Sequence, residues 1–332
     1  MAAIPTVLYI GDDQVTNGTI SAARAPAGLV ALGAGGGYYG LYQHNYKFSR
    51  VVPSGADGVT GGTFDPYWDG TLAQWVKFHY APSTAGPAMV GSYGDNWMQS
   101  ADTVGTVTPT PMLMNKLWER FPGGFKLIKY TIGNGFVGAG GWSSGSTSFA
   151  GIVSTAQTAG AALAGTDTLD VQAIIIDAAM TDLASPATTA SGFLTAVQSF
   201  CSNIRAALDG QTRVVCAATT PIVLVVPHPD AYPQSALLPD GPGITQTYRN
   251  WLFQVANEST DVHAFDMSWA RTWRTGLTIN PGVTNEPGVY PAAGSRRYYG
   301  TDDVVEAGVR LGSFLNGVWA EIPTAPAGSA IP

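Results

Sequence analysis

The chain has 332 residues, of which 45% are hydrophobic and only 12% are charged, and its formal net charge is −7. That apolar content is ample for a sizeable buried core. The sparse positive charge, with no basic block, argues against nucleic-acid binding. The longest apolar runs, such as Ile222–Val226, are far shorter than the roughly 20 residues that span a bilayer, so no membrane span is expected.

Cysteine and histidine are few, and their spacing indicates neither a metal site nor a cofactor site. Cys201 and Cys216 fit neither a disulfide framework nor a zinc site, so we expect two buried thiols. The four histidines are scattered and lack the spacing of metal ligands. The sequence therefore predicts no metal and no cofactor.

Strands and helices alternate along the chain, as short apolar runs and helical spacing predict. In chain order they are a strand at 6–10, a helix at 111–121, a strand at 125–132, a helix at 152–164, a strand at 171–176, a helix at 187–208, strands at 213–218 and 222–226, a helix at 244–256, a strand at 262–266 and a helix at 302–320. The long stretches 28–110 and 271–300 have no helical period.

This alternation implies right-handed crossovers and a parallel sheet that helices cover on both faces. No strong linker divides the chain. We therefore predict one domain over residues 1–322, with insertions at approximately 28–110 and 271–300. A Pro/Ala/Gly-rich tail follows at 323–332.

Polar blocks follow the predicted strands, at the edge where an open parallel sheet carries its chemistry. They are Gly11-Asp12-Asp13 after the first strand, Gly133-Asn134-Gly135 and then Trp142 after the second, Asp177 to Asp182 after the third, and Tyr298 to Asp303 before the last helix.

The order of these blocks resembles the SGNH-hydrolase superfamily, and within it the sialate O-acetylesterase-like carbohydrate esterases. In that family the first strand ends in Gly-Asp-Ser, with the serine as nucleophile. An Asp-X-X-His element before the final helix supplies the base. The resemblance implies an α/β fold of three layers, α/β/α (flavodoxin-like, SGNH-type), with a central parallel sheet and long loop insertions.

The catalytic motifs of this chain are degenerate by comparison with that family. Asp13 stands where the nucleophilic serine belongs, and Tyr298 stands nearest to the position of the base histidine. No histidine follows His263. Acyl transfer needs a hydroxyl that a neighbouring base activates, so the resemblance implies that esterase activity is lost. The degenerate site positions are Asp13, Asn134, Asp182, Tyr298 and Asp302.

Aromatic residues are concentrated in the insertion 28–110. Such side chains stack on sugar rings or pack against another subunit, and the alternative is packing within the domain. The predicted binding residues are Tyr38, Tyr39, Tyr42, Trp68, Trp75 and Trp142.

Two functions fit these observations. The first is a catalytically inactive structural or binding protein of a phage or phage-like virion (head or tail decoration, fibre or spike), which contacts glycans and other structural subunits in an assembly. The second is an active carbohydrate O-acetylesterase or glycosidase with a rearranged site, in which Asp13 or Asp302 acts. Because the first strand begins almost at once, no cleaved signal peptide is expected. The expected location is the virion or the extracellular space, and otherwise the cytoplasm.

Overall fold

The computed structural model of the chain describes residues 2–11, 67–69, 74–76, 109–131, 135–137, 141–177, 182, 190–229, 242–270, 272–274, 297–299 and 301–321. Within these residues, one eight-stranded sheet contains strands that lie between residues 3 and 266 of the chain. Its order is β3 (Gln74–Val76), β2 (Tyr67–Asp69), β4 (Lys126–Thr131), β1 (Ala3–Gly11), β5 (Thr168–Asp177), β7 (Ile222–Val226) and β8 (Val262–Asp266), and β6 (Val214–Val215) pairs with β5.

The central strands are parallel, and each is joined to the next by a helix. Taken in sequence order, β1, β4, β5, β7 and β8 are arranged 2-1-3-4-5, which is the order of flavodoxin-like folds. The strands β1, β5 and β7 contain continuous apolar runs, because a parallel sheet is buried on both faces. All of Ile222–Val226 is buried, for example. The edge strand β3 is the exception in direction, since it runs antiparallel to β2.

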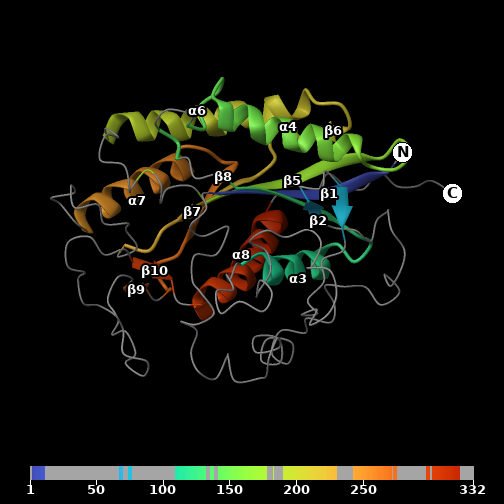
Figure 1. The fold of residues 1–332 in the computed structure, drawn as a ribbon. Helices are drawn as coiled ribbons and strands as arrows, with labels where there is room; N and C mark the ends of the chain where they lie inside the picture. The colour runs from blue at the N-terminus through green and yellow to red at the C-terminus, as the bar shows by residue number, and fades with distance from the viewer. Residues whose placement is uncertain are drawn as a thin grey trace.

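Helices cover both faces of the sheet (Figure 1). One face carries α4 (Thr147–Ala161), α6 (Ala190–Asp209) and α7 (Pro242–Asn257), and the opposite face carries α3 (Thr110–Arg120) and α8 (Thr301–Glu321). The chain thus has a three-layer α/β/α fold with a central parallel sheet, as the sequence predicts.

Helix α8 donates a hydrogen bond to a bulge in β5. The register between β1 and β5 shifts after Thr6, which leaves Gln172 as the extra residue of β5. The indole of Trp319 on α8 donates its Nε1 hydrogen to the carbonyl of Gln172 at 2.9 Å. A buried carbonyl needs such a partner, so the last helix fixes the bulge in the central sheet.

The start of one helix and the interpretation of one segment need the clearest correction. Helix α4 begins at Thr147, five residues before the predicted start at 152, because the Ser146 side chain accepts a hydrogen bond from the Phe149 N–H and caps the helix. The segment 271–300, predicted to be irregular, contains an antiparallel ribbon of β9 (Thr272–Arg274) and β10 (Arg297–Tyr299). Strands this short leave no periodic signal in a sequence.

The two cysteines are free and buried, which confirms the prediction for them. Burial raises the pKa of Cys201 to about 12 and the pKa of Cys216 to about 11. No helix in the described ranges is long and apolar enough to cross a membrane.

Candidate functional site

The carboxyl ends of β4, β1 and β5 lie side by side. Gly11 ends β1, and it pairs in register with Thr131 at the end of β4 and with Asp177 at the end of β5. The winding of the chain reverses at β1, since β4 lies on one side of it and β5 on the other. Ligands of open parallel sheets bind beyond the carboxyl ends of the strands at such a point. We therefore place the candidate site at the edge formed by these three strand ends.

Asp182, which follows β5, joins the loops of the two strands that flank β1. Its side chain is almost completely buried, with 1% of the residue exposed. Oδ2 accepts the N–H of Phe136 at 2.8 Å, and Oδ1 accepts the N–H of Val137 at 2.9 Å. We call this pair of hydrogen bonds the Asp182 clasp. A carboxylate used in this way holds the backbone of the loop that follows β4.

The segment 135–137 is fixed by its own side chains as well. A Cβ on Gly135 would collide with the carboxylate of Asp182, so only glycine allows this close approach. The ring of Phe136 packs edge-on at centroid distances between 5.5 and 5.8 Å against three other aromatic rings, those of Trp142, Phe193 and Phe200.

Trp142 corrects one of the binding predictions. Its indole was expected to be available to a ligand or partner, yet the residue is 0% exposed and lies in the core beside Phe136 and Phe200. The surrounding Gly/Ser-rich sequence is typical of an exposed loop, so burial of Trp142 could not be predicted from it. Trp142 packs against Phe136, in the segment that follows β4.

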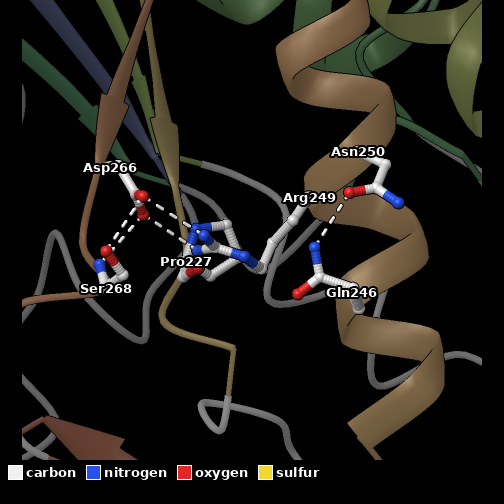
Figure 2. Close-up of polar contacts among 6 residues, drawn as sticks. All are labelled: Pro227, Gln246, Arg249, Asn250, Asp266 and Ser268. Atoms are coloured by element: carbon white, nitrogen blue, oxygen red, sulfur yellow. Dashed lines mark hydrogen bonds and ion pairs between the residues drawn. The ribbon is translucent and has the colours of Figure 1, made fainter.

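A second polar group lies at the ends of β7 and β8 (Figure 2). Arg249, on α7, donates to Asp266 Oδ1 at 2.9 Å and Oδ2 at 3.2 Å, and it also donates to the carbonyl of Pro227. Asp266 accepts two further hydrogen bonds from the backbone N–H and the hydroxyl of Ser268, each at 2.9 Å. One guanidinium therefore ties α7 to the ends of two strands.

Burial raises the pKa of Asp266, but the hydrogen bonds from Arg249 and Ser268 outweigh it, so the pKa lies below its usual value. The sequence analysis missed this pair. The available signal was an arginine inside the apolar stripe of α7, between the buried Thr245 and Leu252. A buried cation in such a stripe requires hydrogen-bond acceptors nearby, which Asp266 and the carbonyl of Pro227 supply.

Several predicted site residues cannot be compared with the geometry. Asp13, Asn134, Tyr38, Tyr39 and Tyr42 lie outside the described residues, as does the tail 323–332. For the others only the backbone is described: Tyr298 pairs with Trp273 in the β9–β10 ribbon, Asp302 lies in the first turn of α8, and Trp68 lies in β2.

Trp75 packs within its own chain. Its Nε1 donates to the carbonyl of Ala159 on α4 at 3.0 Å, and the ammonium of the buried Lys126 lies 4.6 Å from the centre of its ring. This cation–π contact joins the edge strand β3 to β4. The ring of Trp75 therefore packs within its own domain, which is the alternative to sugar or subunit contact that the sequence left open.

No metal centre is formed within the described ranges, which contain no group of three or more His, Cys, Asp or Glu side chains that could hold an ion. The site offers fixed backbone and buried carboxylates.

The strand order and the position of this site define a doubly wound α/β protein with its candidate site at the switch point. The sequence matches no protein-family model and no curated protein. Its fold is similar to the solved structure of a protein from Arabidopsis thaliana, with a TM-score of 0.50, 13% identity, and coverage of 95% of this chain and 98% of that chain. It is also similar to a carbohydrate acetylesterase from Sinorhizobium meliloti, with a TM-score of 0.43, 9% identity, and coverage of 95% and 99%. At these identities the likeness concerns the fold alone.

Proposed function

We propose that this chain is a catalytically inactive, SGNH-hydrolase-like structural or binding protein that contacts glycans. In this proposal it is a component of a phage or phage-like virion, as a head or tail decoration, a fibre or a spike. The fold provides a scaffold on which esterase chemistry is common, but a scaffold does not decide the chemistry.

The observation that carries the proposal is the sequence at the end of β1. This strand ends at Gly11, between β4 and β5, and Asp13 follows two residues later. The resemblance assigns that position to the nucleophilic serine. A carboxylate has no hydroxyl to acylate, and no histidine follows His263 to act as base before α8.

The composition supports the assembly part of the proposal. Only 12% of the residues are charged, and the insertion 28–110 is rich in tyrosine and tryptophan. Aromatic residues are enriched where proteins meet other subunits, and they also stack on sugar rings. Partner subunits and cell-surface glycans are therefore the proposed contacts.

A glycan screen tests the proposal. The purified protein is applied to an array that pairs O-acetylated glycans with their deacetylated forms, and acetate release is measured on the glycan that is retained best. We expect retention of at least one glycan with no acetate released. Acetate release that continues over many turnovers would establish the active carbohydrate O-acetylesterase instead, and cleavage of the sugar chain would establish a glycosidase. No retention of any glycan would overturn the binding role.

A further inference from the structure

We infer that the layer of α4, α6 and α7 is the surface through which two copies of this chain associate. The inference rests on the assembly part of the proposed function, to which it adds a surface and a partner. It makes no use of glycan binding.

The three helices form one continuous layer on one face of the sheet, with α6 packed between α4 and α7 (Figure 1). Helix α4 contains no charged residue, α6 contains only Arg205 and Asp209, and α7 contains only Arg249. Arg205 binds backbone carbonyls next to the sheet, and Arg249 is buried. Among the exposed residues that the structure describes on these helices, Asp209 alone is therefore charged. We call these exposed residues of α4, α6 and α7 the uncharged face.

The opposite helical layer shows that this property is local. Helices α3 and α8 carry ion pairs at their surface, Lys116 with Glu119 and Arg310 with Glu306, and Arg120 is exposed as well. A low overall charge would thin out charged residues on both layers alike. The surface of a soluble protein is ordinarily rich in charged side chains. Their loss from one layer alone marks that layer as a contact surface, because the centre of a protein interface is depleted of charge.

The charge balance of the chain favours a second copy as the partner. With a net charge of −7, two copies repel each other wherever acidic surfaces meet, and the uncharged face avoids this repulsion. Exposed amides on it, such as Gln157, Asn203 and Gln254, each offer both a donor and an acceptor. The same face can therefore form hydrogen bonds with its own copy across a two-fold axis. The nearest acidic residues, Asp209 at the end of α6 and Glu258 just after α7, lie at the rim of the face.

The size of the layer suits a stable dimer. The helices have 15, 20 and 16 residues, which corresponds to lengths of about 22 to 30 Å. Packed helices lie about 10 Å apart, so the layer presents roughly 700 Å². A standard protein interface buries about 800 Å² on each partner.

The test compares Ser202→Arg on α6 with a matched control, Ser313→Arg on α8. Both serines are exposed, and each lies three residues from an arginine of its own helix, Arg205 and Arg310 respectively. Both substitutions change the net charge equally, so only the position of the new charge differs. Sedimentation velocity over a wide range of protein concentration gives the dimer dissociation constant of the full chain and of each variant, and thermal unfolding shows that each variant is folded.

We expect the wild type to dimerise, Ser202→Arg to weaken the dimer at least tenfold, and Ser313→Arg to leave it unchanged. Like charges brought together in an interface are strongly unfavourable. A wild type that stays monomeric at every concentration overturns the inference. A dimer that Ser202→Arg does not weaken, or that Ser313→Arg weakens equally, also overturns it, because the contact then lies elsewhere.

If Ser202→Arg does not fold, Ser154→Arg on α4 provides the second variant, since Ser154 is also exposed on the uncharged face. The same loss of dimer is expected, and a dimer as tight as that of the wild type would contradict the inference. The glycan array separates this outcome from the proposed function. A monomer that retains a glycan overturns the inference and leaves the binding role intact, whereas a dimer that retains none supports the inference and overturns the binding role.

Discussion

The two edges of the central sheet differ in how arginine is used: at the amino edge two arginines bind several backbone carbonyls, and at the carboxyl edge Arg249 binds a carboxylate and one carbonyl. At the amino edge, Arg205 donates to the carbonyls of Thr220 and Asp261 at 2.6 and 2.8 Å, just before β7 and β8 begin. Arg213 does the same for the loop that enters β5, where it reaches the carbonyls of Leu163, Ala164 and Asp167 at distances from 2.8 to 3.0 Å.

At the carboxyl edge the holding groups are mainly carboxylates that accept backbone N–H groups. Asp182 binds the N–H groups of Phe136 and Val137, and Asp266 binds that of Ser268 while also pairing with Arg249. Arginine keeps its charge at every pH a protein tolerates, whereas carboxylates lose theirs in acid. Carboxylates also accept N–H groups at the amino edge, those of Cys216 by Asp209 and of Ala2 by Asp167, so the two edges differ in the arginines that bind carbonyls rather than in the presence of titratable groups.

The largest expected effect comes from Asp266→Ala, at about 3 kcal/mol of lost stability. This change leaves the buried guanidinium of Arg249 without its anion, and an unpaired buried charge is the expensive half of a broken pair. Arg249→Met should cost less, because the carboxylate that remains is 36% exposed and can be solvated. Urea unfolding of both variants gives the comparison, and the reverse order would show that the unpaired guanidinium of Arg249 is not the more costly half of the pair.

Gly135→Ala comes next, with an expected loss of about 2 kcal/mol. Its methyl group would occupy space taken by the Asp182 carboxylate, and overpacking of this kind forces backbone to move. Gly123→Ala is the matched control, since nothing lies within 4 Å of a Cβ built there. Equal unfolding free energies for the two variants would show that the Asp182 carboxylate does not lie against Gly135.

A smaller difference, about 1 kcal/mol, should separate two substitutions at Arg213 on the amino edge. Arg213 has a φ of 63°, in the left-handed region that favours glycine. Both Arg213→Gly and Arg213→Ala lose the carbonyl contacts, but only alanine also carries the backbone strain. Arg213→Gly should therefore be the more stable variant in chemical denaturation. A more stable Arg213→Ala would contradict the assigned conformation.

The smallest expected effect is the loss in acid of the stability that Asp266 contributes. The pKa of Asp266 is lowered on folding, so its stabilisation is fully present above the unfolded pKa of about 3.9 and is lost as pH falls through the folded value. The stability difference between the wild type and Asp266→Asn should therefore shrink as urea midpoints are measured from pH 6 down to pH 3. A stability difference that grows in acid would mean that folding raises the pKa of Asp266 instead of lowering it.

The sequence predicts the frame of the fold better than the contacts of the site. β8 was predicted at its observed bounds, Val262–Asp266, because a short run between a helix and a turn leaves a local signal. The Asp182 clasp joins residues 45 and 46 positions apart, and no local pattern records such a pairing. Trp142 was misread for the same reason, since burial of a loop residue depends on distant helices.

Hydrolysis of p-nitrophenyl acetate tests the central claim most directly, since a residue other than serine stands at position 13. The rate is measured for the wild type, for Asp13→Ala and for Asp13→Ser. We expect all three to match the buffer rate, because the serine of the last variant would still lack a histidine base. Turnover by the wild type well above the buffer rate, abolished in Asp13→Ala, would show that the chain is an active hydrolase with an aspartate-based site.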